Sequence, residues 1–566
     1  MCGIAGVISE NVTEINFDKM LLAQKHRGPD FTGKYVSNNI ALGHNRLSII
    51  DLSEEANQPF YSKDKRYILV FNGEIYNYIE LKEELVKDYI FTTKSDTEVL
   101  LAAYIKWGKD CLSKLNGMFA FAIWDSEDKK LFAARDRFGV KPFYYSNNEN
   151  EFYFASEIKT LFAGGISKKT EDYVWANYFK YGSYGLPNET FWKGVYQLPG
   201  GHFLEYQHHQ LVIEKWYVFE EEIKKYQKVL PFEEVKATYH KLLEDSIKLR
   251  FRADVPVGFN ISGGVDSSTL LAFVNRTQTK KNIKAYTFCT NNKDYDELPW
   301  VEEMISLTNN PLTKVLLDVK DIEQFAKELS DFQDEPFGGV PTIAYAEIFK
   351  QAQRDGVKVL LDGQGMDEQW AGYDYYLNNN GNVVQGVTKS PFRLNVLSEE
   401  FLKLAKKPYY PKPFEDNILN LQYRDLFYTK IPRALRFNDR VSMAASTELR
   451  EPFLDYRLVE FAFAQPIEYK INKGIQKYLL RTLISEYLSD TISFTPKRPL
   501  QTPQREWLGN ELKEFVNLQV DKINSSKYKH WFQETALKQE WGNYLNGENE
   551  SSFHIWQWIN TTLLLE

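Results

Sequence analysis

Two stretches of the sequence carry residue types that suit covalent and phosphate chemistry, and the first is the cysteine at position 2. Cys2 is small enough for the initiator methionine before it to be removed, which would leave Cys2 at the mature N-terminus. A thiol beside a free α-amine, whose ordinary pKa is about 7.7–8.0, has its own base within reach. The alternative is that Cys2 only begins a buried strand, because free cysteine packs well in apolar surroundings.

The second stretch is the heptapeptide at residues 262–268, Ser-Gly-Gly-Val-Asp-Ser-Ser. It lies between a strand-like and a helix-like segment, and it matches neither the Walker A loop nor the dinucleotide-binding GxGxxG pattern. Small residues and hydroxyls at a helix N-terminus present backbone N–H groups to an anion. Asp266 would repel a phosphate unless Mg²⁺ lay between them, and Mg²⁺ prefers carboxylates together with phosphate oxygens. The alternative is a polar turn that caps a helix.

Composition excludes a membrane-spanning protein and a secreted one. The chain has 566 residues, of which 43% are hydrophobic and 26% charged, as is typical of a globular protein with more than one domain. Its longest apolar runs, 99–105 and 118–124, have seven residues each, whereas a membrane-spanning helix needs about twenty. The beginning of the chain lacks the basic segment of a secretory signal, so a cytoplasmic protein is expected.

Net charge and cysteine content exclude several further kinds of partner and site. The net charge is −8 and the basic residues are scattered, so nucleic acid is not an expected partner. Cys2, Cys111 and Cys289 are too far apart for a zinc or redox motif and too few for a disulfide framework, and no HExxH occurs.

The elements that must position these residues differ between the two halves of the chain. Up to residue 206, short segments rich in aromatic and β-branched residues predict strands, and three stretches show helical periodicity. We expect strands over 40–42, 67–71, 118–124, 130–134, 143–145 and 152–155, and helices over 17–26, 79–87 and 97–107. Antiparallel sheets flanked by helices form an α+β layered domain.

Strands alternate with helices after residue 231, which predicts a parallel sheet with crossover helices. We expect strands over 255–261, 285–290, 313–319 and 357–361, and helices over 267–276, 301–308, 322–332 and 343–354. The chain after residue 398 is predicted to be mostly helical. A charged stretch at 220–228 is typical of a solvated connector, so the predicted domains are 1–206 and 231–566, with a linker at 207–230.

Five segments of the first domain resemble the class II glutamine amidotransferases, a family of N-terminal-nucleophile hydrolases. They are CGIAG at 2–6, HRGPD at 26–30, GHNRLSII at 43–50, NGEIYN at 72–77 and KSDTE at 94–98. The resemblance implies an αββα sandwich in which the Cys2 thiolate attacks the side-chain amide of glutamine. Two further matching segments, RDRFGVKP at 135–142 and ASEIK at 155–159, are interpreted as structural.

Each of the segments' candidate site residues fits a step of glutamine hydrolysis. The Asn72 side chain and the Gly73 N–H would stabilise the oxyanion, although Asn-Gly alone would favour a hairpin turn. Arg46 can hold the carboxylate of free glutamine, and Glu74 and Asp96 suit its ammonium group. The predicted catalytic residues are Cys2, Asn72 and Gly73, and the predicted glutamine-binding residues are Arg46, Leu47, Ile49, Ile50, Asn72, Gly73, Glu74 and Asp96.

The second half resembles the ATP pyrophosphatases in the loop at 262–268, and the chain as a whole resembles the glutamine-hydrolysing asparagine synthetases. The match continues in LDGQGMDE at 361–368, in ELREPFLD at 448–455 and at Lys477, where a solvated helix face is the alternative. The resemblance implies Mg²⁺ held through Asp266 and Asp367. It implies an ATP site of Ile261, Ser262, Gly263, Gly264, Asp266, Ser267, Ser268, Thr290, Asp362, Gly363 and Lys477.

The family's reaction would use glutamine, MgATP and aspartate, with ammonia passing between the two sites to an aspartyl adenylate. Two departures leave the acceptor open. The family's Ser-Gly-Glu-Gly is here Asp362-Gly-Gln364-Gly, and the stretch at 496–508 also differs. One alternative is amidation of another carboxylate, such as a sugar uronic acid of a surface polysaccharide. Another is a regulator that binds glutamine and nucleotide without synthesis. The oligomeric state is left open, with a homodimer as one option.

Overall fold

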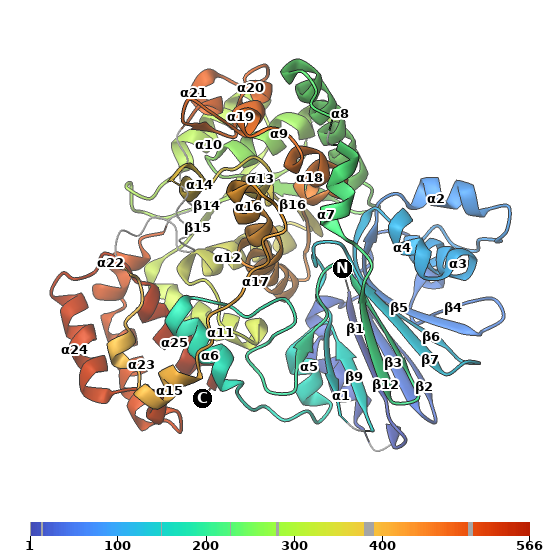
Figure 1. Ribbon diagram of the computed structural model, residues 1–566, viewed down its shortest axis with the longest axis horizontal. Coiled ribbons are helices and arrows are strands. Elements are labelled where there is room, and N and C mark those ends of the chain that lie inside the picture. The colour runs from blue at the N-terminus through green and yellow to red at the C-terminus, as the bar shows by residue number, and fades with distance from the viewer. Residues whose placement is uncertain are drawn as a thin grey trace.

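The computed structural model describes residues 2–12, 15–148, 150–226, 228–278, 282–378, 390–495 and 502–565. Figure 1 shows a strand-rich part, coloured blue to cyan, beside a larger helical part, coloured green to red. The two parts correspond to the two halves of the sequence, which differ in their predicted elements.

The strand-rich part contains two antiparallel six-stranded sheets. The first has the order β10-β8-β9-β1-β3-β2, with bounds β1 Gly3–Ile8, β2 Phe31–Ser37, β3 Ile40–Arg46, β8 Tyr144–Asn147, β9 Phe152–Ala155 and β10 Tyr196–Gln197. The second has the order β12-β11-β7-β6-β5-β4, with bounds β4 Phe60–Tyr61, β5 Tyr67–Ile75, β6 Gly117–Asp125, β7 Lys130–Arg135, β11 His202–Gln207 and β12 Gln210–Lys215.

The two sheets face each other and carry helices on their outer faces, which confirms the predicted αββα sandwich. The apolar run of β6 shows why. Ala120, Ala122 and Trp124 enter the core between the sheets, whereas Phe119 and Phe121 pack under helices on the other side. Successive residues of a strand point to opposite faces, so a strand covered on both sides is apolar throughout. The covering helices are α1 Phe17–Ala23, α2 Tyr78–Leu85, α3 Asp96–Trp107, α4 Cys111–Lys114 and α5 Ile158–Ala163.

The second part is built on a parallel five-stranded sheet of order β15-β14-β13-β16-β17. Its strands are β13 Val257–Asn260, β14 Ala285–Cys289, β15 Leu312–Leu316, β16 Val359–Leu361 and β17 Glu448–Arg450. The first four were predicted and β17 was not. Figure 1 shows α8, α9 and α10 on one side of this sheet and α11, α12 and α17 on the other. Parallel sheets are covered in this way because both faces are apolar.

Helices make up most of the remaining chain, as predicted for the region after residue 398. Their bounds are α6 Asp172–Tyr181, α7 Phe219–Glu222, α8 Phe232–Arg250, α9 Val265–Thr277, α10 Leu298–Thr308, α11 Ile322–Gln333, α12 Val340–Arg354, α13 Met366–Gln369, α14 Asp374–Asn378, α15 Glu399–Leu404, α16 Asn417–Phe427, α17 Lys430–Ala444, α18 Tyr456–Phe463, α19 Ile467–Lys470, α20 Tyr478–Ile484, α21 Asp490–Ser493, α22 Gln504–Gly509, α23 Lys513–Ser525, α24 Glu534–Leu545 and α25 Phe553–Leu565. A two-stranded ribbon, β18 Ile471–Asn472 and β19 Ile475–Gln476, precedes α20.

The segment at 207–230 has more structure than the connector that its charge predicted. Strand β12 pairs with β11 along its whole length, and Phe219 and Ile223 are buried in a core that they share with residues of α16 and α18. The glutamates and lysines of this segment form ion pairs on its exposed side. The exact division at 206 and 231 stays a prediction.

Membrane-spanning helices and clusters of metal ligands are both absent from the part of the chain that the structure describes. None of the helices in that part of the chain is both long and apolar enough to cross a membrane. The same residues contain no cluster of three or more histidine, cysteine, aspartate or glutamate side chains arranged to hold a metal.

Candidate active sites

Cys2 lies directly before β1, at the end of the sandwich that faces the helical part. It is buried, and its backbone N–H donates a hydrogen bond to Oδ1 of Asn72 over 3.0 Å. The thiol faces the carbonyl oxygen of Leu47, with 3.9 Å between sulfur and oxygen. Burial raises the pKa of the Cys2 thiol, so the thiolate needs a base to form.

Asn72 and Gly73 continue strand β5 and do not form a hairpin turn. They pair with Ala120 and Phe119 of β6. Nδ2 of Asn72 is buried and has no hydrogen-bond partner among the described residues, so a donor is left next to Cys2. Gly73 has φ 151°, and a Cβ there would lie 2.1 Å from the Met118 carbonyl oxygen. Only glycine fits at this position, and its N–H directly follows Asn72, the residue that contacts Cys2.

Arg46 ends β3, and its guanidinium lies within the loop that follows. Nη1 donates to the Ser53 carbonyl over 2.7 Å and to Oδ1 of Asn57 over 2.8 Å, and Nη2 donates to the Asp51 carbonyl. The same loop carries the predicted glutamine-binding residues, all buried: Leu47, Ile49 and Ile50. These bonds fix the loop that borders the thiol, and the predicted contact of Arg46 with a substrate carboxylate remains a prediction.

Glu74 and Asp96 are two buried carboxylates that lie near each other, and Glu74 also acts on the Cys2 thiol. Asp96 is the first residue of α3 and accepts a hydrogen bond from the Ile75 N–H over 2.9 Å. Burial raises the pKa of Asp96 to about 6. Burial and the neighbouring Glu448 raise the pKa of Glu74 well above its usual range, and Arg450 lies 3.6 Å from its Oε2. A bound ammonium group would offset this concentration of acid.

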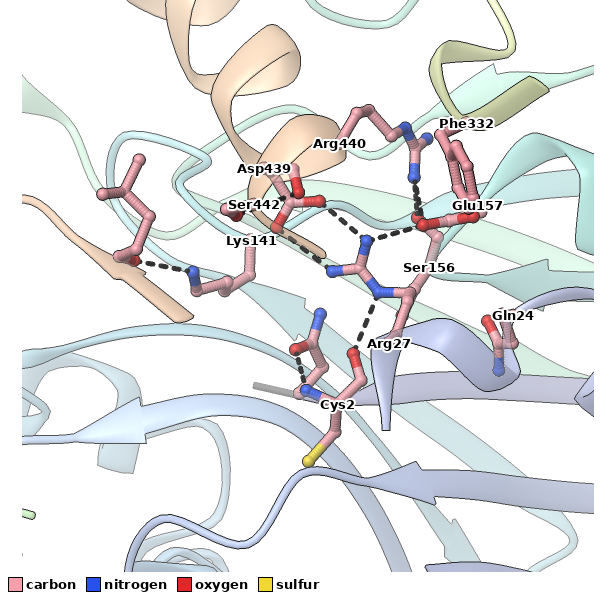
Figure 2. A network of polar contacts seen from close by, with 12 residues as sticks. Cys2, Gln24, Arg27, Lys141, Ser156, Glu157, Phe332, Asp439, Arg440 and Ser442 are labelled. Carbon is pink, nitrogen blue, oxygen red and sulfur yellow. Dashed lines mark hydrogen bonds and ion pairs between the residues drawn. The ribbon is translucent and has the colours of Figure 1, made fainter. Parts of the chain in front are cut away.

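A buried network of charged side chains connects the backbone of Cys2 to the helical part (Figure 2). Nε of Arg27 donates to the carbonyl oxygen of Cys2 over 3.0 Å. The same guanidinium donates to Asp439 on α17, over 2.8 and 3.1 Å, and to Glu157 over 2.8 Å. Arg440, also on α17, lies 3.3 Å from Glu157. Burial opposes the charge of Asp439, but Arg27 holds its pKa below the usual range.

The predicted nucleotide loop follows β13 and opens α9, as the sequence indicated. It borders a cavity of about 620 Å³ at the carboxyl edge of the parallel sheet, the edge where such sheets bind ligands. Six predicted ATP or metal residues line this cavity in addition to Asp367: Ile261, Ser262, Asp266, Ser267, Asp362 and Gly363. A smaller adjoining cavity of about 110 Å³ is lined by Gly264 and Lys477.

Three predicted ATP residues lie outside both cavities. The Ser268 hydroxyl is buried and donates to the Gly264 carbonyl over 2.7 Å. The N–H of Gly263 faces Oε2 of Glu297 over 3.4 Å, and Thr290 is buried just beyond β14. These residues support the loop and are not part of its cavity lining.

Lys477 precedes α20 and lies between the two predicted metal carboxylates. Its Nζ is 2.6 and 2.8 Å from the oxygens of Asp266 and 2.6 Å from Oδ1 of Asp367. Burial would lower the pKa of Lys477, but these two aspartates hold it above the usual range. Since a cationic group already bridges the carboxylates, they converge well enough to hold a cation, and hard oxygen ligands suit Mg²⁺. The solvated helix face is therefore not the environment of Lys477.

Asp362 and Gln364 lie in the loop after β16, and both face the larger cavity. The Tyr345 hydroxyl hydrogen-bonds Asp362, and burial raises the pKa of this carboxyl. Oδ2 of Asp362 has no hydrogen-bond partner among the described residues. Both the Asp362 carboxylate and Gln364 are therefore placed to act on a ligand in the larger cavity.

The structure adds two features that the sequence analysis did not assign. Glu451 follows β17 and its carboxyl group is buried near Asp362, and burial together with Asp362 raises the pKa of Glu451 well above its usual range. Helix α17 forms one wall of the cavity, with Lys430, Arg433 and Phe437 on the side that faces it. The spacing of three and four residues is the signal that could have identified this helix face.

Comparison with known proteins assigns both parts of the chain. Residues 1–217 match the glutamine amidotransferase domain family and residues 238–566 match the asparagine synthase family. Glutamine-hydrolysing asparagine synthetase 3 of Bacillus subtilis is 30% identical and spans 88% of this chain and 86% of its own. A putative glutamine-hydrolysing asparagine synthetase 2 of Methanocaldococcus jannaschii is 36% identical, over 71% and 80%. Amidase chry2 of Gibberella zeae is 26% identical, over 93% and 92%.

Proposed function

The chain belongs to the glutamine-hydrolysing asparagine synthetases, ATP-dependent ligases that take nitrogen from glutamine, and from this premise we propose that aspartate is its acceptor and asparagine its product. The observation that carries the proposal is the shared helix α17. Its residues line the nucleotide cavity, and its Asp439 holds the arginine that binds the carbonyl of Cys2.

In the first half of the proposed reaction, the Cys2 thiolate attacks the side-chain amide of glutamine. The unpartnered Nδ2 of Asn72 and the N–H of Gly73 support the developing oxyanion, which is the most effective use of preorganised donors in acyl transfer. Asp96 and Glu74 hold the ammonium of the substrate, and Arg46 its carboxylate. Ammonia leaves as the thioester forms, and water then releases glutamate.

In the second half, ATP occupies the cavity above β13. The aspartate side-chain carboxylate attacks the α-phosphorus, the bond from this phosphorus to the bridging oxygen breaks, and pyrophosphate leaves. Backbone N–H groups at the start of α9 receive the phosphates, together with Lys477. A carboxylate is a poor electrophile, and adenylation gives it a leaving group. Ammonia then forms the C–N bond, the C–O bond to AMP breaks, and Asp362 accepts the proton that nitrogen loses.

Asp266 and Asp367 are the residues proposed to hold Mg²⁺. Their convergence on the Lys477 ammonium supports this assignment. Magnesium supplies charge neutralisation for the phosphates and a Lewis acid next to them. The part played by the chain is to keep two carboxylates pointing at one place beside the loop.

The test is a screen for pyrophosphate release with ammonia as the nitrogen source. We expect release with aspartate, together with AMP and asparagine in equal amounts. Glucuronate and an acceptor-free reaction are the comparison arms, and we expect neither to release pyrophosphate. Release with glucuronate and not with aspartate would replace the proposed acceptor. Absence of release with every acid, while glutamine and ATP still bind, would favour a regulator.

A further inference from the structure

The cavity that the proposed reaction uses has an uneven distribution of charge. Its wall near the nucleotide loop is acidic, with carboxylates at Asp266, Glu297, Asp362 and Asp367. The two cations that line the same cavity from α17 are Lys430 and Arg433, one helical turn apart. An acceptor with two carboxylates is repelled by the acidic wall unless its second carboxylate lies near these cations.

Lys430 already has carboxylates around it. Asp425 and Glu368 are close enough to raise its pKa, although burial and Arg433 lower it to about 7. Its Nζ also lies over the rings of Tyr373 and Tyr375, at 5.1 and 5.6 Å from their centres. The charge of Lys430 is therefore compensated within the protein.

Arg433 differs from the other arginines of its helix. Arg436 lies 3.2 Å from Glu335, and Arg440 lies 3.3 Å from Glu157. Among the described residues, the guanidinium of Arg433 makes neither a hydrogen bond nor an ion pair, and it lies over the face of the Tyr184 ring, 5.5 Å from the ring centre. A guanidinium has five N–H donors, and the ring holds one face of it while its edge stays available to the cavity.

We propose that Arg433 binds the non-reacting carboxylate of the acceptor, and so makes the enzyme select an amino acid with two carboxylates. The inference rests on the proposed function, because it assigns the residue that recognises aspartate. A planar guanidinium suits a bidentate carboxylate, and the Tyr184 ring fixes its plane. The reacting carboxylate is then directed toward the phosphates at the opposite, acidic wall.

The position of Arg433 also fits the path of the chemistry. Further along the same helix, Asn438 lines the cavity and Asp439 joins the network that reaches Cys2. An acceptor held at Arg433 thus lies between the phosphate end of the cavity and the side from which the glutaminase half is reached. Helix α17 would then position the acceptor and also border the side from which ammonia arrives.

The test compares L-aspartate with β-alanine, which is aspartate without its α-carboxylate. Pyrophosphate release is measured with ammonia as the nitrogen source for the wild type, Arg433→Met and Arg433→Lys. We expect Arg433→Met to lower kcat/KM for aspartate on the order of 10²–10³-fold, mainly through KM, while kcat/KM for β-alanine stays the same. Arg433→Lys keeps the charge without the planar fork, so its loss should be intermediate.

Arg354→Met is the matched control, because Arg354 is an exposed arginine at the end of α12. It should leave both acceptors unaffected, and thermal melting of all variants reports their folding. A loss in Arg433→Met no greater than in the control overturns the inference, as does an equal loss for aspartate and β-alanine, or a loss confined to KM for ATP. Failure of the wild type to use aspartate instead contradicts the proposed function itself.

Discussion

At the scale of single residues, the glutaminase site combines a buried thiol with donors that have no partner. Burial raises the pKa of Cys2, and Asn72 offers its carboxamide oxygen to the Cys2 N–H while its Nδ2 stays unused. Burying a donor without a hydrogen bond costs free energy. The cost is offset when an oxyanion forms there, which is the moment at which catalysis needs it.

Cys2→Ala should abolish glutamine hydrolysis, by roughly 10⁴-fold or more, because no other group can form the thioester. Ammonia-dependent synthesis should survive, since the second site needs ammonia from any source. Both activities are measured as glutamate and pyrophosphate release. Cys111→Ala removes another buried thiol, in α4, and should leave both activities in place. Equal loss of both activities in folded Cys2→Ala would contradict the two-site assignment.

The pKa of Asp96 predicts how glutamine binding depends on pH. Burial raises this pKa to about 6, so the carboxylate is charged above that pH and takes up a proton as the pH falls through it. KM for glutamine should therefore rise about tenfold per unit once the pH is below that pKa. Steady-state kinetics measure it, and Asp96→Asn should show a high KM without this dependence. A wild-type KM that stays constant across the same range would remove Asp96 from ammonium recognition.

Asp362 and Gln364 predict opposite responses in the synthetase site. Both line the cavity, but only Asp362 can accept a proton, and burial raises its pKa and hence its basicity. Asp362→Asn should slow ammonia-dependent amide formation about 10²–10⁴-fold, whereas Gln364→Glu should be tolerated. Product formation is compared with pyrophosphate exchange, which should continue in both variants. A severe loss in Gln364→Glu with none in Asp362→Asn would contradict the assignment of Asp362 as the proton acceptor.

At the scale of elements, strand β5 carries the proposed catalytic residues in its interior and not in a loop. Asn72 and Gly73 stay in register with β6, and the left-handed φ of Gly73 brings its backbone close to Met118. Backbone pairing with β6 positions a donor more rigidly than a turn would. The site therefore depends on one glycine that no other residue can replace.

Gly73→Ala should destabilise the protein by about 1–3 kcal/mol, because its Cβ would overlap the Met118 carbonyl, and glutamine hydrolysis should fall with it. Chemical denaturation and glutaminase assays measure the two effects. Gly542 in helix α24 is the control, since nothing lies within 4 Å of a Cβ there. Gly542→Ala should stabilise the helix by about 1 kcal/mol. Destabilisation by both substitutions to the same degree would contradict the strain at Gly73.

Sequence patterns predicted most elements near these sites, because strand and helix periodicities depend on burial that neighbours in sequence report. They identified the strands that became β5, β6, β13 and β16. Strand β17 was missed, since three residues are too few for a period. The dipeptide Asn72-Gly73 would by itself favour a hairpin turn, but pairing with β6 keeps it in an extended strand. A rule based on neighbouring residues alone therefore fails there. Lys477 and Glu451 acquire their surroundings only from distant segments, which no local pattern contains.

At the scale of the whole molecule, the two catalytic parts meet through charged groups that are fully buried. Arg27, Glu157 and Asp439 form hydrogen bonds that leave their charges compensated. Burying such ions costs several kcal/mol each, and the geometry must be nearly ideal to offset it. The network thus fixes α17 relative to Cys2 and with it the spacing between the two sites.

Asp439→Asn should lower the free energy of unfolding by about 3–5 kcal/mol, because it leaves Arg27 with less negative charge in a buried place. Glutamine hydrolysis should also fall, since Arg27 holds the Cys2 carbonyl. The control is Asp18→Asn, which breaks an ion pair with Lys34 whose partners are 71% and 50% exposed. That change should cost about 0–1 kcal/mol. Equal small effects in denaturation experiments would show that the buried network does not hold the two parts together.

The Arg27 network also determines which pieces can be exchanged between related enzymes. A chimaera that takes its glutaminase part from one relative and its synthetase part from another keeps the Arg27–Glu157 pair but inherits only half of the Arg27–Asp439 and Glu157–Arg440 pairs. Where the synthetase donor lacks a carboxylate at the position of Asp439, Arg27 loses one of its two counter-ions and its attachment to α17. We then expect the interface of the hybrid to be unstable, although both halves keep their own active-site residues. Arg27 and Glu157 must therefore travel together with Asp439 and Arg440. Libraries of domain-swapped ligases built on this scaffold should be cut so that these four side chains are transplanted as one unit.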